Sequence, residues 1–308
     1  MSDNPSGRND FGDLVTERRN PRSMRLDVMS TAEIVALIND EDATVAAAVR
    51  GALPEIARAA DLIADRLRRG GRLFYVGAGT SGRIAMLDAA EWTPTFGTDP
   101  GLVRAVVAGG AEATIAAASA LEDDAEQGAQ DLAVHDPVPS DVVVGIAASG
   151  RTPYVLGALR KARAAGAATI ALCSNANTPM AEEADLAIVV LTGPEVLTGS
   201  TRMKAGTAQK MVLNMLSTAA MVRLGKVYSN LMVDMVPANE KLLHRARRIV
   251  AEAAGVSPAQ AAQVLEAAGN HVKTAIVMAV LRCGRDEARA ALERAGGMVR
   301  IALEARRP

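Results

Sequence analysis

Two short segments rich in glycine and hydroxyl side chains hold the residues whose types and spacing could do chemistry. Residues 77–83 read Gly-Ala-Gly-Thr-Ser-Gly-Arg, and residues 148–153 read Ala-Ser-Gly-Arg-Thr-Pro. Hydroxyls beside free backbone N–H groups at the start of a helix suit a compact phosphate monoester. We therefore expect the hydroxyl side chains of both segments to bind a phosphorylated sugar. These candidate substrate-binding residues are Thr80, Ser81, Ser149 and Thr152.

The first segment also fits the dinucleotide pattern G-x-G-x-x-G, which is a weak signal by itself. Two features disfavour a nicotinamide cofactor. The next apolar run ends in Ala108-Gly109-Gly110, where a ribose-binding acid is expected, and the segment carries two adjacent hydroxyls. A structural alternative stays open, in which both segments are ordinary tight turns whose Ser and Thr cap helices. Because a segment rich in glycine and hydroxyl side chains follows two of the predicted strands, a phosphosugar pocket is favoured.

The elements that must position these segments form a repeating pattern of short apolar runs, each followed by a turn and a helical stretch. Runs that are apolar on both faces and alternate with helices indicate a parallel sheet covered on both sides. Ligands of such sheets bind beyond the carboxyl ends of the strands. The sequence therefore predicts a doubly wound α/β fold with a five-stranded parallel sheet. The predicted strands are residues 72–76, 103–107, 141–147, 168–173 and 186–191.

Helical patterns flank this sheet region on both sides. Ser30 and Glu33 make a capping box that predicts a helix start, and Pro54 predicts a break in the helical stretch 45–69. After residue 240, five short helical segments separated by glycines predict a small helical domain, with Ser257 and Asp286 as candidate N-caps. We expect a flexible segment over residues 1–25, the α/β domain over 26–239 and the helical domain over 240–308.

Composition narrows the class of protein. The net charge is −1 and aromatic residues make up 2% of the 308 residues, so no basic surface interleaved with aromatics points to nucleic acid. Cys173 and Cys283 have no metal-ligand spacing and are expected to be free thiols. No stretch reads as a signal sequence or a membrane span. We expect a cytoplasmic protein without a metal.

Residues 193–210, GPEVLTGSTRMKAGTAQK, carry a specific resemblance. This segment resembles the signature shared by N-acetylmuramic acid 6-phosphate etherases and the glucokinase regulatory protein, which belong to the sugar isomerase (SIS) domain class. The similarity covers most of the chain and includes GAGTSGR at 77–83, GIAASGRTPY at 145–154 and NLMVD at 230–234. It implies a SIS fold, a C-terminal domain of the UBA-like type and a homodimer.

The resemblance also implies a reaction, the removal of D-lactate from N-acetylmuramic acid 6-phosphate to leave N-acetylglucosamine 6-phosphate. Such a lyase uses an acid–base pair and no cofactor. Matching motifs imply that Glu91 is the acid and Glu122 the base, with the two roles exchangeable. Lys241, with Lys204 and Lys210, is a candidate anion partner, and the alternative that each is only a surface lysine stays open. The residues after Glu91 depart from the family pattern, because Trp92-Thr93 stands where Cys-Pro is expected. Without the resemblance, Glu122 reads as part of a solvated acidic helix face.

Two other functions fit the same fold. A phosphosugar isomerase would use the same phosphate segments with a single base. A sugar-phosphate sensor, as the glucokinase regulatory protein is, would need no acid–base pair. Fold alone does not separate these functions from the etherase; the two glutamates favour the lyase.

Overall fold

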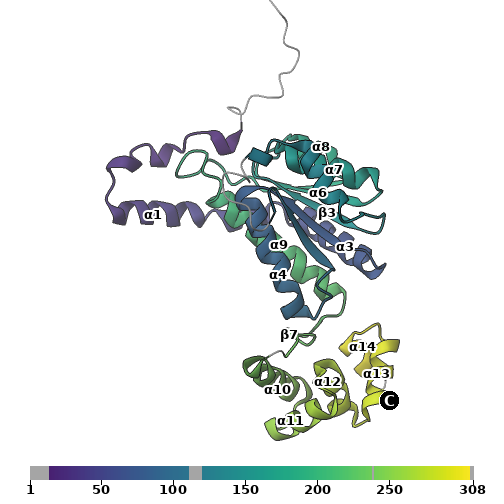
Figure 1. Cartoon of the computed structure of the whole chain (residues 1–308). Helices are drawn as coiled ribbons and strands as arrows, with labels where there is room; N and C mark the ends of the chain where they lie inside the picture. The colour runs from purple at the N-terminus through teal and green to yellow at the C-terminus, as the bar shows by residue number, and fades with distance from the viewer. Residues whose placement is uncertain (1–13, 111–119, 238, 306–308) are drawn as a thin grey trace, which may run out of the picture. The chain divides into compact units, whose positions relative to one another are not determined.

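The computed structural model describes residues 14–110, 120–237 and 239–305 (Figure 1). By their internal contacts these residues form two compact units, which are described separately below. The first unit contains the chain up to Ala89 together with Val103–Leu216, and the second contains Ala90–Leu102 and the chain from Ser217 onward.

The first unit is built on a five-stranded parallel sheet in the order β2-β1-β3-β4-β5. The prediction of a doubly wound α/β fold is confirmed. The order places β1 beside both β2 and β3, so the direction of winding reverses between β1 and β3. That reversal is the position where open α/β sheets bind ligands. The strands are β1 Leu73–Gly77, β2 Val103–Val107, β3 Val142–Ile146, β4 Ala168–Cys173 and β5 Leu186–Val189.

Helices cover both faces of this sheet, as the unbroken apolar runs predict. On β1, Phe74 and Val76 pack in one core cluster with side chains of α6 (Ala125–Ala133) and α7 (Pro153–Ala164). Tyr75 points to the other face, where its hydroxyl donates to the carboxylate of Asp88 on α4 (Gly79–Phe96) at 2.9 Å. Full burial of all five β1 residues follows from this double cover. The remaining helices of the sheet region are α8 Pro179–Glu183 and α9 Lys204–Arg223.

The N-terminal helices confirm the local signals. Helix α1 (Thr31–Asp42) begins with a complete capping box between Ser30 and Glu33. The predicted break at Pro54 separates α2 (Val45–Arg50) from α3 (Leu53–Arg68), because proline fits the first turn of a helix and not its interior. Helix α1 projects from the body of the first unit (Figure 1), and only Leu37 and Glu41 in it are buried.

The second unit contains the ends of α4 and α9, and its described residues from Val227 onward form a short antiparallel hairpin and five helices. The hairpin strands, β6 Val227–Tyr228 and β7 Leu231–Met232, were not predicted because each has only two residues. Ser257 caps its helix as predicted, but Asp286 does not: Gly284 is the N-cap, and Asp286 lies in the first turn, where a carboxylate favours the helix dipole. The helices are α10 Glu240–Ala254, α11 Pro258–Ala267, α12 Val272–Leu281, α13 Arg285–Arg294 and α14 Val299–Glu304.

Side chains of all five helices form the apolar core of the second unit. Among the described residues, no single helix is long and apolar enough to cross a membrane. The bent pair α11 and α12 passes that test by length and composition only.

Candidate active site

The two segments rich in glycine and hydroxyls meet in space because the strands before them are neighbours. The first follows β1 and the second follows β3, and these strands pair in parallel from Leu73 opposite Val142 to Gly77 opposite Ile146. Their carboxyl ends therefore lie side by side at the reversal point of the sheet.

A pocket of about 310 Å³ opens at this position. It brings together all four hydroxyl residues predicted to bind substrate and one of the two predicted catalytic glutamates, Glu122. Two further polar residues, Glu17 and Thr201, come from segments distant in sequence. The lining residues are Glu17, Ala78, Gly79, Thr80, Ser81, Glu122, Ile146, Ala147, Ala148, Ser149, Thr152 and Thr201.

Thr80 and Ser81 lie in the first turn of α4, which begins at Gly79. Because β1 ends at Gly77, only Ala78 separates the strand from the helix. Backbone N–H groups of a first turn lack partners within the helix and favour an anion. Glycine makes this approach possible, since a Cβ on Gly82 would lie 2.5 Å from Cγ1 of Val107 and 3.0 Å from the carbonyl oxygen of Gly77. The segment is thus a helix start pressed against the end of β1.

Thr152 and Ser149 use their hydroxyls differently. Thr152 is the N-cap residue of α7, yet its side chain makes no capping hydrogen bond. Its hydroxyl instead donates to Oε1 of Glu122 at 3.5 Å, which is a long contact. Ser149 Oγ accepts from the backbone N–H of Arg151 at 3.2 Å and stabilises the turn. The helix-cap alternative is therefore wrong for Thr152, while Ser149 does serve the local turn.

Glu122 is half-buried in the pocket lining, just before α6. Its backbone carbonyl accepts from the N–H of Tyr154 at 3.1 Å, which fixes it beside the first turn of α7. Burial raises the pKa of the Glu122 carboxyl above its ordinary value, and the charge of Asp123 raises this pKa further. The hydrogen bond from Thr152 lowers it in part. A carboxylate with a raised pKa is a better proton acceptor near neutral pH.

The pocket lining contains neither Glu91 nor Lys241. Glu91 is exposed on α4, and it follows Gly79 by twelve residues, about 18 Å along a helix axis. Lys241 is exposed near the start of α10 in the second unit. Trp92, which stands where the family pattern has another residue, is 1% exposed and packs edge-on to Phe96 with ring centroids 6.2 Å apart. Trp92 is therefore a packing residue.

The signature segment at 193–210 is anchored by two buried carboxylates. Glu195 accepts from the backbone N–H groups of Lys204 and Ala205, both at 3.0 Å, and so caps the start of α9. The Lys204 ammonium lies 2.6 Å from Oε2 of Glu41 on α1, and both side chains are nearly buried. Lys204 is thus a partner of Glu41 and does not line the pocket. These contacts hold the loop that carries Thr201 into the pocket.

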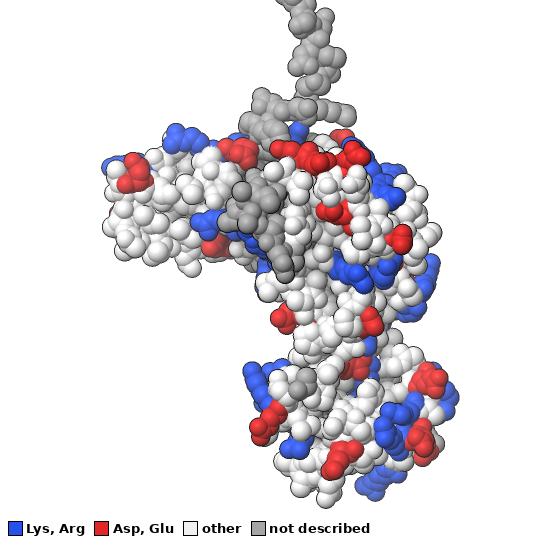
Figure 2. Space-filling view, in the orientation of Figure 1, with Lys and Arg blue, Asp and Glu red and all other residues white. Residues whose placement is uncertain are grey.

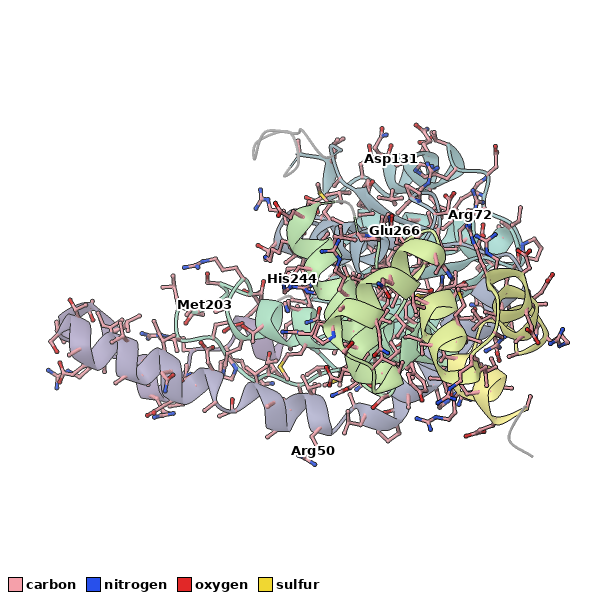
Figure 3. The ribbon with its side chains drawn as sticks, turned by 90° about the horizontal axis from the view of Figure 1, so that it is seen from below. Arg50, Arg72, Asp131, Met203, His244 and Glu266 are labelled. Carbon is pink, nitrogen blue, oxygen red and sulfur yellow. The ribbon has the colours of Figure 1, made fainter. Side chains whose placement is uncertain are left out.

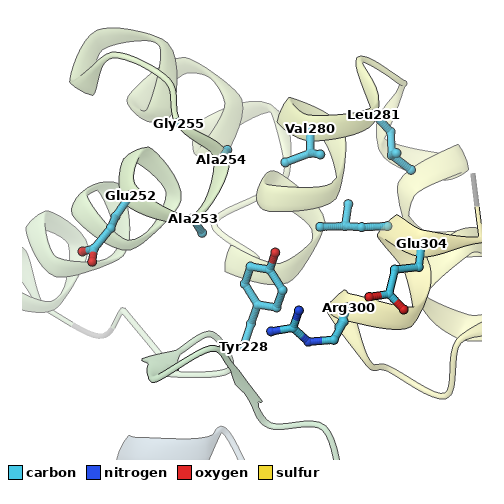
Figure 4. Close-up of a pocket in the computed structure, with 10 residues that line it drawn as sticks. Tyr228, Glu252, Ala253, Ala254, Gly255, Val280, Leu281, Arg300 and Glu304 are labelled. Carbon is cyan, nitrogen blue, oxygen red and sulfur yellow. The ribbon is translucent and has the colours of Figure 1, made fainter. Parts of the chain in front are cut away.

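The second unit has a larger pocket of about 720 Å³, which contains none of the predicted site residues (Figure 4). In it the guanidinium of Arg300 lies over the ring of Tyr228, 5.4 Å from the centroid. His244 is exposed on α10 (Figure 3). Within the described ranges, no group of three or more His, Cys, Asp or Glu is arranged to hold a metal ion.

Comparison with known proteins agrees with the fold. Residues 55–163 match the glucokinase regulatory protein N-terminal SIS domain, and residues 125–219 match the SIS domain. A phosphoheptose isomerase from Francisella tularensis superposes with a TM-score of 0.51 at 18% identity, over 63% of this chain and all of that one. The fold with its paired strand-end segments therefore defines a SIS-domain protein.

Closer relatives specify the family. The chain is 56% identical over 296 residues to an N-acetylmuramic acid 6-phosphate etherase of Mycolicibacterium smegmatis, covering 96% of this chain and 99% of that protein. It is 60% identical over 264 residues to the etherase of Symbiobacterium thermophilum, covering 86% and 88% respectively. The chain belongs to the N-acetylmuramic acid 6-phosphate etherase family, and the resemblance drawn from the signature segment is confirmed.

Proposed function

We propose that the chain cleaves the D-lactyl ether of N-acetylmuramic acid 6-phosphate and releases N-acetylglucosamine 6-phosphate and D-lactate. The observation that carries this proposal is the 56% identity to a relative of that name over 99% of the relative's length. The reaction is that of a carbon–oxygen lyase in the recycling of cell-wall amino sugars, and we place it in the cytoplasm. The ligand is a small phosphorylated amino sugar, with no nucleic acid, membrane or cofactor required.

The reaction divides into an elimination and a hydration. A base removes the proton at C2 while an acid protonates the departing lactate oxygen at C3, which leaves a double bond between these carbons. Water then adds across the double bond and restores a hydroxyl at C3. We assign the base to Glu122, because it lies between the two hydroxyl segments and burial makes its carboxylate more basic.

The phosphate is assigned to the first turn of α4, through Thr80 and Ser81, and to the segment that leads into α7, through Ser149 and Thr152. Two helix N-termini and four hydroxyls converge on one small pocket and supply partial positive charge without a formal cation. The described lining contains no Lys or Arg. Lys241 is kept as a further anion partner on the strength of the family motif.

Glu91 is assigned as the acid from its motif, and its position favours a homodimer. Glu91 follows Ser81, the last lining residue of α4, by ten residues, about 15 Å along a helix axis, so we propose that a second copy supplies the acid at each pocket. Helix α1 supports self-association. It projects from the first unit, carries few charges on the face in view (Figure 2), and leaves Val35 57% exposed.

The test of the lyase is D-lactate release by the wild type and by the variants Glu91→Gln and Glu122→Gln. Each variant is expected to lose about 10²- to 10⁴-fold in kcat while still binding N-acetylglucosamine 6-phosphate. A wild-type protein that binds the sugar phosphate but releases no lactate would instead be a sensor.

The shared site has its own test. The two inactive variants, co-expressed so that mixed dimers form, should regain about a quarter of wild-type activity, because each mixed dimer then holds one complete site. Mixed dimers that stay inactive would place both glutamates of a site in one chain.

A further inference from the structure

Glu17 lines the pocket although it precedes the other lining residues by more than sixty positions. It closes a short 3-10 helix, Val15–Glu17, whose turn is fixed by the Glu17 N–H donating to the carbonyl of Leu14 at 3.0 Å. Nothing in the proposed acid–base or phosphate machinery uses this carboxylate. The Glu17 carboxylate is therefore free of a role in these steps and can bind another part of the substrate.

The residue before Glu17 is locked to the pocket by a buried hydrogen-bond network. The Thr16 N–H donates to Oδ1 of Asn175 at 3.3 Å, and Nδ2 of Asn175 donates back to Oγ1 of Thr16 at 3.0 Å. The same Nδ2 donates to the carbonyl of Ala148 at 3.0 Å, directly before Ser149. Thr16 is fully buried and Asn175 is 2% exposed. Satisfied buried networks of this kind hold one geometry, so the backbone that carries Glu17 has a fixed place beside the pocket, while the Glu17 side chain is exposed.

The signature segment 193–210 contacts the same carboxylate through Gly199, which has no side chain to crowd it. Gly199 has a φ of +75°, and a Cβ built on it would lie 3.1 Å from Oε2 of Glu17. A side chain at Gly199 would therefore both strain the backbone and crowd the carboxylate. Two residues further on, Thr201 lines the pocket. The N-terminal segment and the signature loop thus meet at Glu17.

Charge decides which part of the substrate Glu17 can contact. A carboxylate accepts hydrogen bonds and repels a phosphate, which the helix starts of α4 and α7 attract. Sugar hydroxyls and an amide N–H are donors that a carboxylate binds well. We propose that Glu17 is a substrate-binding residue that accepts a hydrogen bond from a hydroxyl or amide group on the sugar end of the phosphorylated amino sugar. This inference rests on the proposed function of the pocket.

The test compares binding of two probes to the full-length wild type, Glu17→Ala and Glu17→Gln by calorimetry. N-acetylglucosamine 6-phosphate should bind Glu17→Ala about tenfold or more weakly, with Glu17→Gln between, since a hydrogen bond to a charged group is lost. Inorganic phosphate should bind Glu17→Ala as tightly as the wild type or more tightly, because a repelling charge is gone. Glu266→Gln, which removes an exposed charge on α11 (Figure 3), should change neither affinity.

Two outcomes would overturn the assignment. Unchanged affinity for the sugar phosphate in Glu17→Ala would remove Glu17 from the binding site. An equal loss of affinity for both probes would mean that Glu17 only supports the phosphate segments. Neither readout needs catalysis, so a protein that releases no D-lactate would refute the lyase and leave the Glu17 result standing.

Discussion

The buried ion pair between Glu41 and Lys204 ties α1 to the start of α9 and so to the loop that reaches the pocket. The side chains are 9% and 4% exposed, with 2.6 Å between Oε2 and Nζ. Arg22 adds a second, half-exposed cation at 3.0 Å from Oε1 of Glu41. Burial by itself would raise the pKa of Glu41, but hydrogen bonds and charge from Lys204, Asn20 and Arg22 lower it overall.

Replacing one residue of this pair should lower the stability of the protein strongly, whereas replacing both residues should lower it little. Loss of one partner of a buried pair costs about 3–5 kcal/mol, because the other charge stays buried and unpaired. We expect Lys204→Met to lower the free energy of unfolding by about 3 kcal/mol, because Arg22 still faces Glu41. Glu41→Met should lower it by more, because Lys204 then loses the carboxylate that lies 2.6 Å away. The double variant should recover most of the loss, since apolar residues of similar size often replace a buried pair at little cost.

Urea denaturation of the wild type, both single variants and the double variant measures these free energies. A loss of 3 kcal/mol corresponds to a fall in Tm of about 5 °C if all 308 residues unfold together. Because the folded pKa of Glu41 is depressed, the pair stabilises fully above the unfolded pKa, near 4.5, and its contribution disappears as pH falls through the folded pKa. Additive losses in the double variant, or a loss below about 1 kcal/mol in Lys204→Met, would refute the reasoning.

Two further predictions concern the pocket. Glu122 can accept a proton only as a carboxylate, so kcat/KM should rise as pH rises through its pKa. Asp123→Asn should move this rise to lower pH, because the charge of Asp123 raises the pKa of Glu122. Thr152→Val should move it to higher pH, because the Thr152 hydrogen bond lowers that pKa. A profile that neither variant moves would argue against Glu122 as the base. Gly82→Ala should destabilise the protein by about 1–3 kcal/mol and raise KM, because its Cβ would lie 2.5 Å from a side chain of β2. Gly284→Ala, where a Cβ meets nothing within 4 Å, is the matched control, and equal effects of the two would show that packing at the helix start is not the cause.

Local signals in the sequence predicted the elements well, and for physical reasons. The Ser30 capping box and the break at Pro54 depend on contacts within a few residues, so both could be predicted before any fold was known. The strand order depends on contacts across the whole chain. The recurrence of the hydroxyl segments after two strands leads us to expect one shared pocket, but the direct pairing of β1 with β3 that joins them follows from no pattern within either strand.

The same distinction explains which site residues could not be predicted. Glu17 and Thr201 reach the pocket through contacts between segments that are remote in sequence. Glu17 belongs to no pattern with a recognised chemistry, whereas Thr201 stands in the signature segment 193–210 without having been singled out there. The polar composition of residues 1–25 predicts a flexible segment; of these residues the structure describes those from Leu14 onward, with two short 3-10 helices at Val15–Glu17 and Pro21–Ser23. A buried Thr16 is compatible with that composition only because Asn175 supplies both a donor and an acceptor.

The acidic cluster around Glu122 shows how one charge pattern can contain several different roles. Asp124 is the N-cap of α6 and accepts from the N–H of Gln127 at 2.9 Å, which is a structural role. Asp123 is exposed, and its charge raises the pKa of its neighbour. Only Glu122 turns into the pocket, because its backbone carbonyl is held by Tyr154 of α7. A run of acids predicts a solvated face on average, so the identity of the carboxylate that lines the pocket depends on a contact with α7 that composition does not encode.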